Sequence, residues 1–104
     1  QRQNATGVQQ MIVKQGNRYL IDGPVTLDTV GVLIAESTAF DGDRVIVDLA
    51  GVTRADSSGL SLLLEWTRRF NGSGRQIAFA NLSQSLQSLA DLYGVADLVP
   101  LAAD

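Results

Sequence analysis

The side chains best suited to chemistry in this chain of 104 residues lie in one short stretch around its centre. That stretch offers two carboxyls and three hydroxyls, those of Asp48, Thr53, Asp56, Ser57 and Ser58. A nucleophilic serine needs a general base, but the chain has no His and no Cys, and its one lysine, Lys14, lies far away in the sequence. We therefore expect no catalytic residue and no enzymatic activity.

The sequence also offers too few ligands for a metal site. Asp48 and Asp56 are hard oxygen ligands, but Ca²⁺ and Mg²⁺ take several oxygens and the sequence offers no obvious third ligand. A zinc site would lack His and Cys, its commonest ligands. The sequence therefore predicts neither a bound metal nor another cofactor.

The composition indicates one folded domain. Hydrophobic residues make up 45% of the chain and charged residues 18%, which is typical of a globular protein. The formal net charge of −3 argues against nucleic acid as a ligand. No apolar run approaches the roughly 20 residues that span a bilayer, so we expect no membrane insertion and a cytoplasmic location.

The first ten residues are polar and begin without Met. They lack the apolar core of a secretion signal. We expect residues 1–10 to be disordered or derived from expression, with Met11 as the native start and residues 11–104 as the folded domain.

The elements around the polar stretch are a strand and a helix. Residues 45–49 form an apolar, β-branched run of strand length, and residues 59–70 carry apolar side chains at helical spacing. Asp and Ser accept hydrogen bonds from the free N–H groups at a helix start, so the tetrapeptide Asp56-Ser57-Ser58-Gly59 should lie where loop becomes helix. Two hydroxyls would then lie at the positive pole of that helix.

The chain before this stretch predicts a hairpin and a helix. Residues 11–13 and 19–22 read as antiparallel strands around a turn at 15–17, and Asp22-Gly23-Pro24 should end the second strand. A first helix should follow, capped by Thr26 or Asp28 and ending before Gly42. Its apolar face is predicted from Leu27, Val30, Ile34 and Thr38.

The chain after it predicts a second strand–helix unit. Residues 44–49, apolar at nearly every position, should be a central strand, with residues 76–80 parallel to it after the helix crossover. Asn81 or Ser83 should cap a third helix through Tyr93, and Gly94 should stop it. Residues 98–101 should pack as a short edge strand or extended segment.

The central helix carries two stripes. Leu60, Leu63, Leu64 and Thr67 fall on one side, and Ser58, Leu62, Trp66 and Arg69 on the other. A neighbouring helix covers the second stripe, or else Leu62, Trp66 and Arg69 form a partner interface. Arg68 and Arg69 should be solvated or paired with Glu65.

A strand followed by Asp-Ser-Ser-Gly-Leu and an apolar helix resembles the STAS domain family, small α/β domains of anti-sigma factor antagonists and of some transporter subunits. The segment from Leu86 to Tyr93 with Leu98-Val99-Pro100 looks like MlaB-type subunits of the Mla phospholipid-transport ABC complex. The resemblance covers about residues 11–101. It implies a single α/β domain with a mixed four- to five-stranded sheet and three to four helices.

The resemblance also implies a function. An MlaB-type chain would be a non-catalytic subunit that binds the MlaF-type ATPase of an inner-membrane phospholipid transporter and lies at that membrane through its partner. The alternative is an anti-sigma factor antagonist inactivated by an anti-sigma factor kinase, with Ser57 in the place of the phosphorylated serine. Both candidate functions would use the motif loop that contains Asp56, Ser58 and Gly59. Taken without the resemblance, the tetrapeptide is better explained as a plain helix cap.

Overall fold

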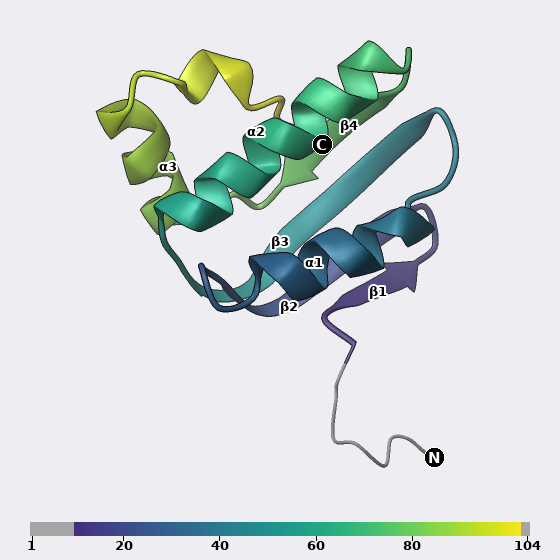
Figure 1. The fold of residues 1–104 in the computed structure, drawn as a ribbon, viewed down its shortest axis with the longest axis horizontal. Helices are drawn as coiled ribbons and strands as arrows, with labels where there is room; N and C mark the ends of the chain where they lie inside the picture. The colour runs from purple at the N-terminus through teal and green to yellow at the C-terminus, as the bar shows by residue number, and fades with distance from the viewer. Residues whose placement is uncertain (1–9, 103–104) are drawn as a thin grey trace.

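The computed structural model describes residues 10–102, so the expectations for residues 1–9 lie outside the described part. The described residues form four strands and three α-helices, arranged around one sheet (Figure 1). In chain order the elements are β1 (Ile12–Gln15), β2 (Arg18–Val25), α1 (Val30–Glu36), a 3₁₀ turn (Ser37–Ala39), β3 (Arg44–Ala55), α2 (Ser57–Gly72), β4 (Gln76–Ala80), α3 (Gln84–Leu92) and a second 3₁₀ turn (Ala96–Leu98).

The sheet is mixed and four-stranded, which agrees with the predicted four to five strands, and its strand order is β1-β2-β3-β4. β1 and β2 form the expected antiparallel hairpin, whereas β2–β3 and β3–β4 are parallel. β3 is a central strand, and the prediction for residues 45–49 is confirmed. The tail is extended near Leu101, which forms an isolated parallel bridge with Phe79 at the β4 edge.

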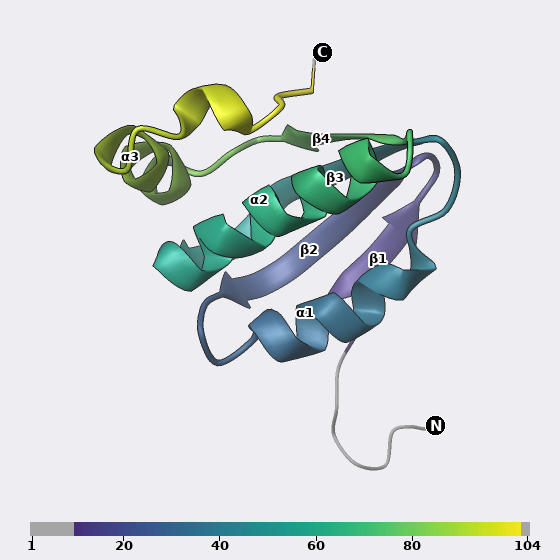
Figure 2. The same cartoon turned by 45° about the horizontal axis from the view of Figure 1, so that its top comes forward.

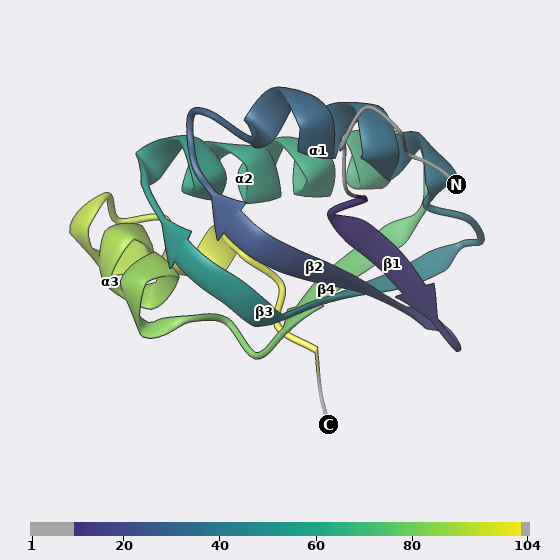
Figure 3. The same cartoon turned by 90° about the horizontal axis from the view of Figure 1, so that it is seen from below.

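Both parallel crossovers step in the same direction across the sheet, from β2 to β3 and from β3 to β4. Because such crossovers are right-handed as a rule, their helices fall on the same face. Figure 2 shows α1 and α2 side by side over the strands, and Figure 3 shows both helices on one side of the sheet. The inward side chains of β3, those of Val45, Val47 and Leu49, are buried beneath them.

The end of β2 differs from the prediction. The sequence Asp22-Gly23-Pro24 does not break the strand, which continues to Val25. Two register shifts against β3, one before Asp22 and one after Gly23, interrupt the regular ladder around the proline. Such irregularities let a strand accommodate a residue that has no N–H to donate. The proline therefore shifts the register of the pairing with β3 but does not end the strand.

The predicted apolar face of the first helix is correct at Val30, which packs against the core, but wrong at Leu27 and Ile34. Leu33 is fully buried, whereas Leu27 and Ile34 are 71% and 38% exposed. The helix begins only at Val30, so Leu27 belongs to the preceding loop and the buried face is shifted by one position. Thr29, not Thr26 or Asp28, occupies the N-cap position, and no side-chain cap bond forms there.

The third helix agrees with the sequence in both its ends. Ser83 is the N-cap, and its hydroxyl oxygen accepts a hydrogen bond from the Leu86 N–H. Gly94 follows the helix with a φ of +68°, a left-handed conformation that glycine adopts without strain. α3 packs beside the first turns of α2 (Figure 1), at the end of the molecule where the Asp-Ser-Ser-Gly tetrapeptide lies.

Candidate functional site at the start of α2

Asp56 is the residue that joins β3 to α2. Its backbone is extended and its side chain caps the helix: Oδ1 accepts hydrogen bonds from the N–H groups of Ser58 at 2.9 Å and Gly59 at 3.2 Å. Oδ2 accepts a third bond, at 3.1 Å, from the N–H of Leu27 in the β2–α1 loop. Both carboxylate oxygens are therefore engaged, and the tetrapeptide lies at the helix start as predicted.

These three N–H groups lower the pKa of Asp56 below its ordinary value, with Leu27 making the largest contribution and Gly59 and Ser58 adding to it. Hydrogen bonds to the charged form favour that form. Asp56 is therefore ionised at neutral pH, where it satisfies N–H groups at the helix end that would otherwise have no acceptor.

Gly59 brings the start of α2 into direct contact with β2. A Cβ atom at this position would lie 2.3 Å from the carbonyl oxygen of Val25 and 2.9 Å from its Cγ1 atom. The same carbonyl accepts a hydrogen bond from the Asp56 N–H at 3.3 Å. Only a residue without a side chain allows this approach, so the glycine sets the position of the helix start on the sheet.

Ser57 and Ser58 are the first two residues of α2. Ser57 is exposed, and its hydroxyl makes no hydrogen bond with any residue that the structure describes. Ser58 is partly buried. The Ser57 hydroxyl is thus free to contact a partner or to accept a modifying group, while the backbone beneath it is fixed by Asp56.

Asp48 does not join this site. It lies eight residues before Asp56 on an extended strand, which corresponds to a separation of about 25 Å at about 3.3 Å per residue. Its oxygens accept bonds from Asn81, Ala50 and Arg18 on the sheet face opposite the helices. These partners, Asn81 first, lower the pKa of Asp48.

Within residues 10–102, no group of three or more acidic, His or Cys side chains is placed to hold a metal ion. No helix in the same range is long and apolar enough to cross a membrane.

The second stripe of α2 is core, and the expectation of a partner interface through Leu62 and Trp66 is wrong. Leu62 and Trp66 are 3% and 2% exposed. The Phe40 ring, just after the 3₁₀ turn that ends α1, meets the Trp66 indole edge-on with centroids 5.2 Å apart. The neighbouring helix layer covers this stripe, which was the alternative left open by the sequence.

Arg69, the third residue of that expected interface, is exposed but paired within its own helix. Its Nε donates to Glu65 Oε2 at 2.6 Å, and Arg68 binds the same carboxylate through Nε and Nη2. The two guanidiniums, Arg68 first, lower the pKa of Glu65 to about 2. The predicted pairing of Arg68 and Arg69 with Glu65 is confirmed.

A comparison against known families places the chain in one of them. A family model described as "Mlab, STAS domain" matches residues 15–100. The chain belongs to this STAS domain family. No curated protein matches the chain at a significant level.

Solved structures show the same STAS fold. The anti-sigma factor antagonist SpoIIAA in its unphosphorylated form aligns with a TM-score of 0.66 and 15% identity, covering 89% of this chain and 87% of that one. The protein TM1081 aligns with a TM-score of 0.68 and 10% identity, covering 98% and 86%. At these identities the likeness concerns the fold alone.

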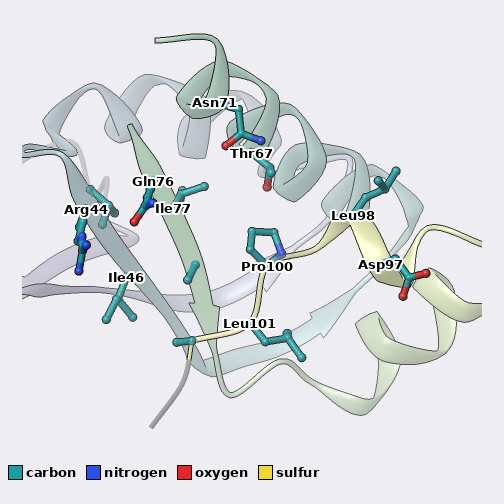
Figure 4. Close-up of a pocket in the computed structure, with 13 residues that line it drawn as sticks. Arg44, Ile46, Thr67, Asn71, Gln76, Ile77, Asp97, Leu98, Pro100 and Leu101 are labelled. Atoms are coloured by element: carbon teal, nitrogen blue, oxygen red, sulfur yellow. The ribbon is translucent and has the colours of Figure 1, made fainter. Parts of the chain in front are cut away.

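A groove in this STAS domain lies away from the tetrapeptide, whose residues are not among those that line it. It holds about 700 Å³ between the second half of α2, β4 and the tail, as Figure 4 shows. Thr67 and Asn71 line one side, Gln76 and Ile77 the floor, and Leu98 and Pro100 the other side. Arg44 and Asp97 supply its charged groups, which lack the convergent geometry of a catalytic site.

One residue of the STAS site was missed by sequence reasoning. Leu27 was assigned to the buried face of a helix, but the structure places it in the exposed loop whose N–H binds Asp56. Its spacing from Val30 fits a helix, and the loop is instead set by Thr29 and Asp56. No signal in the local sequence indicates a hydrogen bond to a residue 29 positions away.

Proposed function

We propose that this chain is an MlaB-type STAS subunit that docks through the start of α2 on the MlaF-type ATPase of an ABC phospholipid transporter, and supports the assembly and activity of that complex. In this role it lies on the cytoplasmic side of the inner membrane and is held there by its partner. It takes part in no chemical step itself.

The observation that carries the proposal is the free hydroxyl of Ser57 on a rigid frame, in a chain that matches the MlaB-type family model. Asp56 accepts hydrogen bonds from three backbone N–H groups, and Gly59 lets the start of the helix lie directly against β2. A contact surface that is already ordered loses little conformational entropy on binding. This arrangement suits a docking site better than a flexible loop would.

A docking role also agrees with the side chains present. The hydroxyl of Ser57 has no His, Cys or Lys neighbour in the α2 start that could act as its base, and Asp56 is occupied by backbone N–H groups. STAS domains generally act through interaction, not through turnover. The function therefore rests on what the surface binds.

A second candidate is an anti-sigma factor antagonist switched by phosphorylation of Ser57. It is favoured by the fold likeness to SpoIIAA and by the exposed, unbonded hydroxyl of Ser57. A phosphate there would add a charge of about −1.5 to −2 beside the ionised Asp56 and would repel that carboxylate. Such a charge would disturb the loop and block docking of the anti-sigma factor kinase.

Affinity purification from membrane and cytosolic fractions separates the two candidates. The tagged chain should recover an ABC transporter ATPase and its membrane subunits from detergent-solubilised membranes. A Ser57→Asp variant, purified in parallel, should lose them. Recovery of a kinase-like anti-sigma factor from the cytosol with no ABC ATPase in either fraction would overturn the transporter assignment in favour of the second candidate.

A further inference from the structure

Leu27 is held in an exposed position beside the α2 start. Its side chain is 71% exposed, although it is a large apolar residue, and its N–H donates to Asp56 Oδ2 at 3.1 Å. The same carboxylate caps the helix at Ser58 and Gly59. Asp56 therefore ties the loop that carries Leu27 to the helix residues that directly follow Ser57.

The loop that carries Leu27 is rigid. The Thr29 hydroxyl accepts a hydrogen bond from the Thr26 N–H at 3.0 Å and donates to the carbonyl oxygen of Pro24 at 2.8 Å. The N–H groups of Thr29 and Val30 both bind the Thr26 carbonyl at 3.0 Å. With these bonds and the bond to Asp56, an exposed leucine is presented from a backbone that has little freedom left to lose on binding.

We propose that Leu27 is the apolar anchor of the docking surface at the α2 start and inserts into an apolar pocket of the partner protein. This inference rests on the proposed function and deepens it, because it extends the surface from Ser57 across Asp56 to the β2–α1 loop. Asp56 then has two tasks: it caps α2, and it holds Leu27 in register with Ser57.

The chemistry around Leu27 selects a protein as the partner. Asp28 follows it directly and the carboxylate of Asp56 binds its N–H, so acidic groups flank the side chain. Anionic lipid headgroups and nucleic acid phosphates would be repelled there. An apolar pocket with polar or basic groups at its rim fits a single leucine between two carboxylates.

A matched pair of leucines tests the inference. Leu92 is 75% exposed at the end of α3, so Leu27→Ser and Leu92→Ser make the same change at nearly equal exposure. Both variants should keep the wild-type melting temperature. Against the purified MlaF-type ATPase, Leu27→Ser should weaken binding by about tenfold or more, as expected for an interface anchor, and Leu92→Ser should not. Equal affinities would overturn the inference.

Site-specific photocrosslinking in cells identifies the docked protein without assuming its name. A photoreactive residue would replace Leu27, Leu92 or Ser61, the last being exposed one helical turn after Ser57. Positions 27 and 61 should capture the same protein, and position 92 should not. If that protein is an ABC ATPase, the inference and the proposed function both stand.

The other outcomes separate the two claims. A kinase-like protein captured at both positions 27 and 61 supports the anchor and overturns the transporter assignment. Capture at position 61 without position 27 overturns the anchor and leaves the docking function intact. No capture at either position overturns both, because no protein would then dock at the start of α2.

Discussion

At the scale of single residues, Asp56 and Gly59 give the α2 start its shape. Asp56 binds N–H groups from two separate segments, the first turn of α2 and the β2–α1 loop. Gly59 lets the helix approach the carbonyl oxygen of Val25. Neither residue needs to contact a partner in order to matter for docking, because together they set where Ser57 lies.

Replacing Gly59 with alanine should destabilise the fold. The new Cβ would meet the backbone oxygen of Val25 at 2.3 Å, a distance that only a shift of α2 can relieve. Overpacking of this kind costs about 1–3 kcal/mol or more. The control is Gly72→Ala in the last turn of the same helix, where a Cβ meets nothing within 4 Å and where alanine favours helix. Thermal melts should show a loss for Gly59→Ala only; equal melting temperatures would contradict the close contact.

The lowered pKa of Asp56 predicts a pH dependence of stability. A carboxyl whose pKa is lower in the folded state than in the unfolded state stabilises the fold above its unfolded pKa of about 4. That contribution is lost as the pH falls through the lowered folded value. The difference in unfolding free energy between the wild type and Asp56→Asn should therefore be largest near pH 7 and shrink below about pH 4.

Urea unfolding at pH 7, 5 and 3 measures this difference. Ser57→Ala serves as the control because it keeps the carboxylate, and its stability should follow that of the wild type at each pH. If the difference in unfolding free energy between the wild type and Asp56→Asn stayed constant from pH 7 to pH 3, the pKa of Asp56 would not be lowered in the folded state.

At the scale of elements, the sequence predicts what depends on neighbours in the chain. The hairpin turn, the buried strand at residues 45–49, the cap at Asp56 and the stop at Gly94 were all predicted correctly, because each depends on residue types within a few positions. The continuation of β2 past Pro24 was not predicted, because it depends on register shifts against β3. The exposure of Leu27 depends on Asp56, which is distant in sequence.

The contact between α1 and α2 shows the same limit of prediction from sequence. Helical spacing predicts that Leu62 and Trp66 share a stripe, but it does not say what covers that stripe. Coverage follows from topology: both crossovers place their helices on one face of the sheet, so α1 and the Phe40 ring after it lie against the outer side of α2. A large apolar stripe on a crossover helix is therefore weak evidence for a partner surface.

Trp66→Ala tests this assignment to the core. Loss of a buried aromatic side chain costs about 3–5 kcal/mol, so the variant should melt well below the wild type. Trp66→Phe keeps most of the packing against Phe40 and should lose less. If Trp66→Ala instead melted like the wild type and only lost its partner, Trp66 would be a surface contact after all.

At the scale of the whole molecule, the fold places the start of α2, our proposed docking site, at one end. β3 leads into Asp56 there, and the loop after β2 carries Leu27 to the same end. Two segments from different parts of the chain thus meet at the start of α2.

The central claim is that Ser57 lies inside a protein contact, and Ser57→Asp tests it most directly. An unpaired charge in an interface costs several kcal/mol, which corresponds to a hundredfold or greater loss of affinity. Ser57→Ala removes no hydrogen bond within the described chain and should melt like the wild type, and it adds no charge to the contact. Ser85→Asp places the same charge on an exposed serine in the first turn of α3 and should leave binding unchanged.

The measurement is the affinity of each variant for the purified MlaF-type ATPase, with melting temperatures taken from the same samples. The account predicts that Ser57→Asp alone loses binding by about a hundredfold while its melting temperature stays within a few degrees of the wild type. Wild-type affinity in a well-folded Ser57→Asp variant would contradict it, and the tetrapeptide would then be a helix cap without a docking role.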